Sequence, residues 1–197
     1  MSKRNQSPKR KSSQNKQWNR TPNPSAKRRP DSNETSQTVE GRHAVREAIL
    51  AGTRRVREVH MSEGLDSASV IDDIANLSQE LRIPLRKHGK AKFKSMTTTE
   101  SAQGVFAVCD PLPDLELEDL IEGTDKPFIL VLDSITDPRN LGSIIRSGEC
   151  AGATGILLPR HRSVRITPTV AKTAQGAIEH IPIATTSGIP KALSRLK

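Results

Sequence analysis

Apolar residues in the second half of the chain alternate between strand-like runs and helix-like spacing. Phe128 to Leu132 is an unbroken apolar run, typical of a strand covered on both faces of a parallel sheet. Leu141, Ile144, Ile145 and Gly148 then recur at the spacing of one helix face. This alternation predicts a parallel sheet with helices on both faces. We expect strands at 128–133, 155–158 and 181–185, and helices at 140–151, 167–180 and 189–196.

The region before it has the pattern of a smaller α/β unit. A helix is expected from Arg42 to Ala51, where Gly52 ends it, and Val56 to Met61 alternates like an edge strand. A second helix follows, with apolar residues at helical spacing from Val70 to Leu81. The remaining elements are strands at 83–87 and 104–109 and a weaker helix at 90–96, which makes three strands in all.

The positive charge of the chain is concentrated at its beginning. The formal net charge is +9, yet residues 1–38 hold ten Lys and Arg against two acids. Only three residues of this tail are apolar, so it is expected to be disordered. Two interpretations remain open: an RNA tether in which Trp18 stacks on bases, or a solubilising extension.

Four regions are therefore predicted: a basic tail at 1–38, an RNA-binding domain at 39–110, an acidic linker at 111–125 and a catalytic domain at 126–197. The chain has no run of 18 apolar residues and no apolar core of a signal peptide, which favours a cytoplasmic protein. Cys109 and Cys150 lie among apolar neighbours and are expected to be buried thiols. The five histidines have no metal-binding spacing, so no metal site is predicted.

Two groups of basic residues are candidates for RNA contact. Between positions 82 and 94 there are six Lys and Arg, one His and no acid, and a second group follows the strand at 155–158. Each is interpreted either as a surface that contacts phosphates or as an ordinary solvated face. The residues proposed for RNA binding are Arg82, Arg86, Lys87, Lys90, Arg160, Arg162 and Arg165.

The segment DPRNLGSIIRSGECAG resembles the motif N-x-G-x-x-x-R-x-A of the SpoU-type RNA ribose methyltransferases. Asn140, Gly142 and Arg146 match it, and Gly148 stands where the family usually has Ala. The segment TPTVAKTAQGAIEHIP is similar to the family's G-A-x-E-x-x-P stretch, and Glu40 to Val45 resembles the start of its N-terminal domain. The resemblance covers residues 39–197.

The resemblance implies transfer of a methyl group from S-adenosylmethionine to a ribose 2′-hydroxyl. It implies that Arg146 lies closest to the hydroxyl and that Asn140 fixes the geometry of the site. Arginine stays protonated, so Arg146 is expected to act as a cation that stabilises a developing alkoxide. Spacing alone favours a solvated arginine on the polar helix face for Arg146, and Asn140 is alternatively a helix N-cap. Gln175 and Glu179 are expected on a helix surface, without a catalytic role.

The resemblance also implies an α/β (trefoil) knot and, in the complete protein, a homodimer. The Glu40–His43 opening resembles the branch that methylates a guanosine of 23S rRNA, and tRNA is the alternative substrate. Two family motifs that build most of the cofactor pocket are expected beyond Lys197. The 197-residue chain is therefore interpreted as incomplete, with a partly molten second half that does not bind S-adenosylmethionine. A protein that binds RNA without catalysis is the rival hypothesis.

Overall fold

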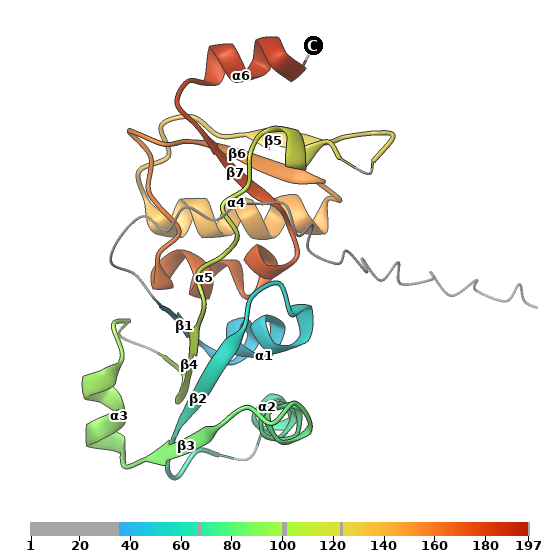
Figure 1. Ribbon diagram of the computed structural model, residues 1–197. Coiled ribbons are helices and arrows are strands. Elements are labelled where there is room, and N and C mark those ends of the chain that lie inside the picture. The colour runs from blue at the N-terminus through green and yellow to red at the C-terminus, as the bar shows by residue number, and fades with distance from the viewer. Residues whose placement is uncertain (1–35, 67, 100–101, 123, 197) are drawn as a thin grey trace, which may run out of the picture. The chain divides into compact units, whose positions relative to one another are not determined.

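The computed structural model describes residues 36–66, 68–99, 102–122 and 124–196 of the chain. Two sheets stand one above the other, each with its own helices (Figure 1). We call residues 36–110 the N-terminal half and residues 128–196 the C-terminal half. Among the described residues, no helix is long and apolar enough to cross a membrane. Most of the predicted basic tail lies outside the described residues, so both interpretations of it stay predictions.

The N-terminal half is a four-stranded sheet with helices on both faces. Its core combines one face of the sheet with the apolar faces of α1 and α2, and buried residues such as Val45, Val59 and Ile74 fill it. On the other face, Phe93 of α3 packs on Phe106. The strand order is β1-β4-β2-β3. The elements are β1 (Gln37–Glu40), α1 (Arg42–Ala51), β2 (Val56–Ser62), α2 (Ser69–Glu80), β3 (Leu85–His88), α3 (Lys90–Met96) and β4 (Val105–Cys109).

Two predictions for this half were wrong. Val56–Ser62 is not an edge strand, because it pairs with β4 on one side and β3 on the other. The sheet also has a fourth strand, β1, which pairs antiparallel with β4. Only Val39 of Gln37–Glu40 is apolar, so this strand has no recognisable hydrophobic pattern. Its other fully buried side chain is the carboxylate of Glu40.

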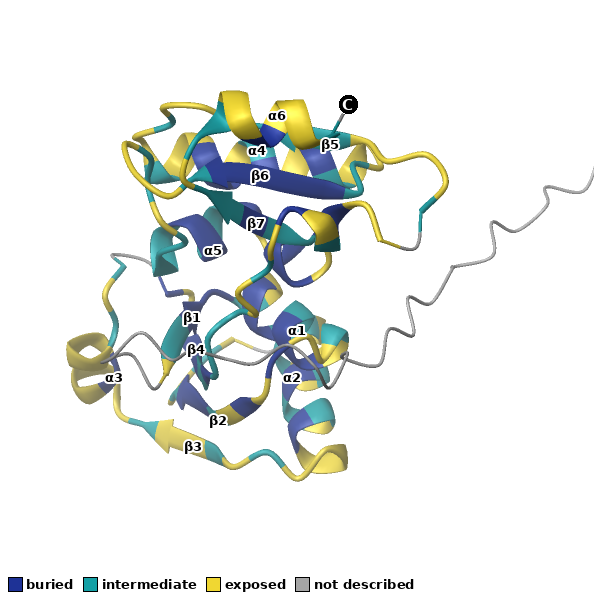
Figure 2. Cartoon of the chain, turned by 45° about the horizontal axis from the view of Figure 1, so that its top comes forward, coloured by how far each residue is buried: buried dark blue, intermediate teal, exposed yellow. Residues whose placement is uncertain are grey.

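The C-terminal half is a parallel three-stranded sheet of order β5-β6-β7, covered on both faces. Leu130, Ile156 and Leu158 point to the face that α4 and α5 cover. Leu157 and Ala184 point to the opposite face, under α6. Figure 2 shows the buried residues between these layers. Its elements are β5 (Ile129–Val131), α4 (Pro138–Cys150), β6 (Gly155–Pro159), α5 (Pro168–Ala174), the 3₁₀ turn η2 (Ala177–Glu179), β7 (Ile183–Thr186) and α6 (Ile189–Leu196). The segment before this half contains one more 3₁₀ turn, η1 (Glu118–Leu120).

The mixed α/β class and the order of the two halves confirm the predicted fold class; the knot stays a prediction. Two details differ. The acidic segment 111–125 is part of the core, because Leu117 and Leu120 are buried against the sheet and Leu115 bridges to Ala184. The predicted helix at 167–180 is broken at Gln175 and Gly176, whose φ angles are 51° and 94°.

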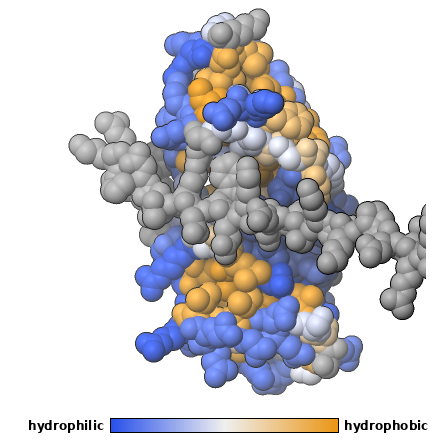
Figure 3. Space-filling model, turned by 90° about the vertical axis from the view of Figure 1, so that its right-hand side faces the viewer, coloured by the Kyte–Doolittle hydropathy of each residue, from blue (hydrophilic) through white to orange (hydrophobic). Residues whose placement is uncertain are grey.

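One face of the molecule has apolar areas over both halves, bordered by polar side chains (Figure 3). The large hydrophobic residues exposed among the described ones are Leu50, Leu81, Met96, Ile121, Phe128 and Leu193.

The contact between α4 and α5 depends on Gly142. A Cβ atom there would lie 2.6 Å from Thr173 Cβ and 2.8 Å from the Val170 carbonyl oxygen. At Gly148 the nearest atom to such a Cβ would be the end of the flexible Leu130 side chain, at 2.4 Å. Gly142 therefore lets two helix backbones approach, whereas Gly148 meets a side chain that can move.

We expect Gly142→Ala to lower the free energy of unfolding by about 1–3 kcal/mol, because overpacking forces the two helices apart. Gly148→Ala is the matched control and should cost about 1 kcal/mol or less, since Leu130 can change rotamer. Urea denaturation of both variants measures the difference. Equal losses of stability would show that the α4–α5 contact does not require Gly142.

Candidate active site

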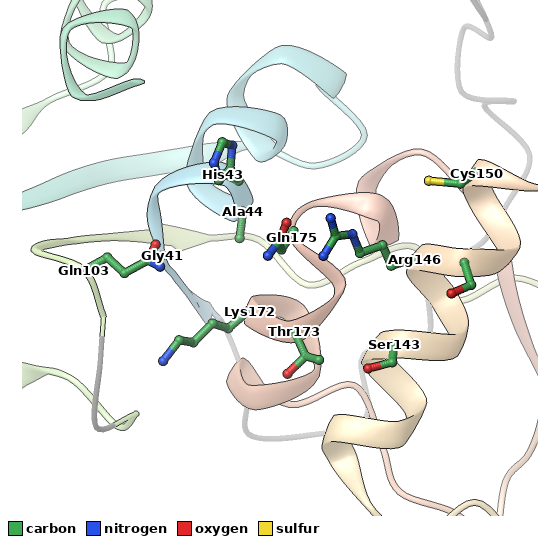
Figure 4. A pocket seen from close by; sticks show the side chains of 11 residues that line it. Gly41, His43, Ala44, Gln103, Ser143, Arg146, Cys150, Lys172, Thr173 and Gln175 are labelled. Carbon is green, nitrogen blue, oxygen red and sulfur yellow. The ribbon is translucent and has the colours of Figure 1, made fainter. Parts of the chain in front are cut away.

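A cleft of about 560 Å³ lies between the two halves of the chain. Its walls come from the beginning of α1, the segment before β4, one face of α4 and the end of α5 (Figure 4). The sequence blocks that carry the family resemblance thus meet in one place. The lining residues are Gly41, His43, Ala44, Gln103, Ser143, Arg146, Ser147, Cys150, Lys172, Thr173 and Gln175.

Arg146 is the most prominent cation in this cleft. Its neighbours on α4, Leu141 and Ile145, are fully buried, so Arg146 is on the opposite, exposed side of the helix. The guanidinium extends toward Gln175 (Figure 4). It makes no hydrogen bond or ion pair with the residues that the structure describes, and its donors are therefore available to a ligand.

Asn140 is not the N-cap of α4. Asp137 is the cap: its Oδ1 accepts a hydrogen bond from the Arg139 amide at 2.7 Å, and Pro138 follows at the first helical position. Asn140 lies in the first turn and is exposed. The helical repeat puts it on the same side as Ser143 and Ser147, one turn beyond the cleft lining. The catalytic roles proposed for Asn140 and Arg146 stay predictions.

The cleft is lined by cations and neutral polar groups, and no carboxylate is among its lining residues. Lys172 joins Arg146, and its Nζ donates to Thr99 Oγ1 at 3.4 Å. Gln103 accepts a hydrogen bond from the Arg42 amide through Oε1, which leaves its NH₂ group for another partner. Such a surface favours a polyanion over a cation.

Glu40 fixes the wall of the cleft that belongs to the N-terminal half. Its carboxylate is fully buried and accepts hydrogen bonds from the amides of Thr98 and Thr99, at 2.7 and 2.9 Å, and from both hydroxyls. Burial raises the pKa of Glu40, but these four hydrogen bonds outweigh it and lower the pKa below its usual value. The next residue, Gly41, has a φ of +104° and turns the chain into α1.

This lowered pKa predicts a loss of stability in acid. Because the folded-state pKa of Glu40 is below that of the unfolded chain, its contribution is present above the unfolded-state pKa of about 4.3 and is lost as the pH falls through the folded value. We expect Glu40→Gln to be less stable than the unsubstituted protein at pH 7, with the difference shrinking below about pH 4. Thermal unfolding from pH 3 to 7 tests this; a difference that does not change with pH would contradict the assignment.

The basic group at 82–94 lies away from the cleft, on β3 and α3. Arg82, Arg86, Lys87 and Lys90 are all exposed, as predicted for a surface group. They follow the strand at one edge of the sheet, whereas β1, at the other edge, faces α5. Any RNA contact they make is therefore made at a distance from Arg146.

A histidine pair lies within this basic surface. His60 Nδ1 is 2.8 Å from His88 Nε2, a distance at which one ring donates a hydrogen bond to the other. Burial, followed by the charges of His60, Lys92 and Arg86, lowers the pKa of His88. Glu58 contacts His60 and accepts a hydrogen bond from Arg86 at 2.8 Å. Although burial tends to raise the pKa of Glu58, these two partners lower it. The basic surface thus includes one acid, which the sequence window 82–94 did not contain.

The other predicted RNA-binding arginines follow the carboxyl end of β6. Arg160, Arg162 and Arg165 are exposed and do not line the Arg146 cleft. Their loop is tied to the loop after β5, because the Val164 amide donates to the Ile135 carbonyl at 2.8 Å. Arg165 instead borders a second cleft of about 370 Å³ beside β1.

The two cysteines differ, contrary to the prediction that both are buried. Cys109 is fully buried, and this raises the pKa of its thiol to about 12. Cys150 is exposed and lines the cleft. Within the described part of the chain, no group of three His, Cys, Asp or Glu residues is arranged to hold a metal ion.

Several cleft residues were not assigned a role from the sequence. His43, Gln103, Lys172 and Gln175 line the cleft, and all but Gln103 lie within the resemblance blocks. Glu179 was expected on a helix surface, but it is buried. Contacts between the two halves, such as those of β1 and α1 with α5, bring these residues together, and a local sequence pattern does not encode such contacts.

Two protein-family models match the chain in sequence. The model described as RNA 2′-O ribose methyltransferase substrate binding matches residues 38–115, and the SpoU rRNA Methylase family model matches residues 127–197. The chain is 36% identical over 165 residues to the 23S rRNA (guanosine-2′-O-)-methyltransferase RlmB of Pseudomonas putida. It is 33% identical over 163 residues to a putative TrmH family tRNA/rRNA methyltransferase of Staphylococcus haemolyticus. These alignments cover 81% of the chain and 65% and 64% of the two relatives.

Solved structures show the same fold. The SpoU methyltransferase AviRb from Streptomyces viridochromogenes, in complex with AdoMet, gives a TM-score of 0.65 at 19% identity, over 82% of this chain and 58% of that one. An rRNA methyltransferase from Sinorhizobium meliloti gives a TM-score of 0.63 at 22% identity, over 81% and 58%. The chain thus spans about two thirds or less of the length of these proteins. The two family models match one after the other along the chain, and the motif arginine is exposed in a cleft between the two matched regions. The chain therefore belongs to the SpoU rRNA methylase family.

Proposed function

We propose that the protein transfers a methyl group from S-adenosylmethionine to a ribose 2′-hydroxyl of RNA. The observation that carries this proposal is the environment of Arg146. It is the arginine of the N-x-G-x-x-x-R motif, it has no partner among the described residues, and it projects into a cleft without acidic lining. A nucleotide with its phosphates is the kind of ligand that such a cleft favours.

The chemistry that Arg146 offers is electrostatic. A ribose hydroxyl is a weak nucleophile, so the reaction needs its oxygen held in line and its developing negative charge stabilised. The Arg146 guanidinium stays protonated and can donate two parallel hydrogen bonds to the neighbouring phosphate. The 2′-oxygen then lies within reach of the same cation. Asn140, on the same side of α4 and one turn away, is proposed to fix the position of the RNA chain.

The cleft residues do not fit the methyl donor. S-Adenosylmethionine carries a sulfonium, an ammonium and a carboxylate, which leaves it with a net positive charge. Arg146 and Lys172 could pair with its carboxylate, but they would repel the two cationic groups, and no carboxylate among the lining residues offsets that repulsion. We therefore assign the cofactor to none of the described residues. Its use by this protein is proposed from the family, one solved member of which is a complex with AdoMet.

A guanosine of 23S rRNA is the proposed target, supported by the 36% identity to an RlmB protein over the region that includes both halves. Transfer RNA is the second candidate, since other relatives are named as tRNA/rRNA methyltransferases. We propose that the exposed basic residues of β3 and α3 and of the loop after β6 contact RNA outside the cleft. We also propose a cytoplasmic location and, from the family resemblance, a homodimer.

A tritiated-methyl transfer assay tests this function. The protein, at the full length of its relatives, is incubated with labelled S-adenosylmethionine and either a 23S rRNA transcript or unmodified total tRNA. We expect label in the 23S rRNA and little in the tRNA, while the reverse result would assign a tRNA substrate. Binding of both RNAs without any methyl transfer would overturn the enzyme hypothesis and favour a protein that binds RNA without catalysis.

A further inference from the structure

The two halves of the chain are joined by a buried ion pair between residues 125 positions apart. Arg54 lies in the loop after α1, and Glu179 lies in η2. Arg54 Nη2 donates to Glu179 Oε1 at 2.5 Å and Nε donates to Oε2 at 3.1 Å, a two-pronged contact. Both side chains are almost completely buried, with 2% and 1% of their surface exposed.

Neighbouring groups hold both partners in place. Thr53 Oγ1 donates to the Glu179 carbonyl oxygen at 2.6 Å, so the backbone of η2 is held as well as its carboxylate. Arg54 Nη1 donates to Gln37 Oε1 at 2.9 Å, which ties the same guanidinium to β1. The contact therefore joins three segments rather than two side chains.

A second contact between the two halves involves the middle of α1. Glu47 Oε2 is 2.9 Å from His180 Nε2, and this pair is partly exposed. A Cβ atom at Gly176 would lie 2.4 Å from Glu47 Cβ, so the turn between α5 and η2 packs directly on α1. Two separated contacts of this kind restrict rotation of one half about the other.

The energetics of buried charges indicate what the pair contributes. Removing two ions from water costs about as much as their attraction returns, so an apolar pair of similar size would stabilise the chain equally well. What an apolar pair lacks is direction, because a carboxylate accepts a planar guanidinium in a narrow range of angles. Arg54 and Glu179 therefore contribute little net stability as a pair, and what they determine is the orientation of the two halves.

That orientation sets the shape of the cleft. Helix α1, whose C-terminal end leads into Arg54, carries His43 and Ala44 at its other end, where they line the cleft across from Arg146. Gln175, beside the η2 turn that holds Glu179, lines the same cleft. A change of angle at the ion pair would therefore move one wall of the cleft relative to Arg146.

We propose that Arg54 and Glu179 are positioning residues, which fix the N-terminal half on the C-terminal half so that RNA bound by the first half presents one nucleotide to Arg146. The part of this proposal that concerns RNA rests on the function proposed above. The fixed orientation of the two halves stands without it.

The test replaces the pair with apolar residues of similar length, Arg54→Met together with Glu179→Met, in the 197-residue chain. Residual dipolar couplings of backbone amides are measured in one alignment medium. We expect a single alignment tensor for both halves of the unsubstituted chain and two different tensors for the double variant, with amide shifts inside each half preserved. Arg57→Met is the matched control, because Arg57 pairs with Asp110 within the N-terminal half and is 44% exposed. A single tensor in the double variant would overturn the proposal.

A second measurement adds RNA, with a 20-nucleotide single-stranded RNA that carries 4-thiouridine as the probe. In the double variant we expect crosslinks to α4 to fall about tenfold while crosslinks to the N-terminal half persist, because a shift of the cleft wall misplaces the nucleotide. Arg54→Lys keeps the positive charge but loses the planar guanidinium. Its crosslinks to α4 should therefore lie between those of the unsubstituted chain and those of the double variant. Two tensors with unchanged crosslinks to α4 would overturn the positioning role in RNA presentation. Crosslinks to neither half of the unsubstituted chain would instead count against the proposed function.

Discussion

Arg146→Ala is expected to lower methyl transfer by about 10²–10³-fold, because it removes the cation that is proposed to stabilise charge on the ribose oxygen. The free energy of unfolding should stay within about 0.5 kcal/mol, since Arg146 is exposed and has no partner among the described residues. A large loss of activity with no loss of stability separates a role in the reaction from a role in folding.

Arg139→Ala is the matched control for this experiment. Arg139 is on the same helix and exposed, but it does not line the cleft, so its removal should leave methyl transfer nearly unchanged. Turnover and thermal unfolding are measured for both variants. If Arg146→Ala retained more than about a tenth of the turnover, its proposed role would be wrong.

The second large effect is expected at the buried ion pair. Arg54→Met alone should lower the free energy of unfolding by about 3–5 kcal/mol, because it leaves the Glu179 carboxylate buried without a counter-charge. Glu179→Met alone should cost a similar amount. The double variant should be much more stable than either single variant, since neither charge is then left unpaired.

Urea denaturation of the four proteins completes this double-mutant cycle. The coupling between Arg54 and Glu179 is obtained as the difference between the double variant and the sum of the two single ones. Additive losses would show that the two side chains do not act as a pair and would remove the basis for their positioning role.

The elements with a strong hydrophobic period were predicted well from the sequence. Helices Arg42–Ala51, Lys90–Met96 and Ile189–Leu196 have the predicted bounds, and the parallel strands lie within about two residues of them. Helix Arg42–Ala51 buries one continuous face of Ala44, Val45, Ala48 and Ile49, and that face is visible as spacing in the sequence. The predicted family is confirmed by the two matched models.

The errors occur where side chains rather than apolar spacing decide the structure. Strand β1 is held by its ladder with β4, and its inward-facing Glu40 is accommodated by hydrogen bonds from Thr98 and Thr99. The N-cap of α4 is Asp137 rather than Asn140, because Pro138 takes the first helical position. A helix start with two suitable capping residues is ambiguous until the backbone angles are known.

The candidate site was predicted only in part for a related reason. Arg146 was recognised from its motif, whereas the opposite wall of the cleft includes Gly41, His43 and Ala44, which are more than a hundred positions earlier. The contact that brings the walls together uses the buried charges of Arg54 and Glu179, which a single sequence does not distinguish from solvated ones.

The most direct test of the account is the identity of the methylated nucleoside. RNA is incubated with the protein and deuterated-methyl S-adenosylmethionine, digested to nucleosides and analysed by mass spectrometry. The account predicts deuterated 2′-O-methylguanosine, which should be absent when Arg146→Ala replaces the unsubstituted protein. A deuterated methyl group on a base rather than on the ribose, or equal product from Arg146→Ala, would contradict it.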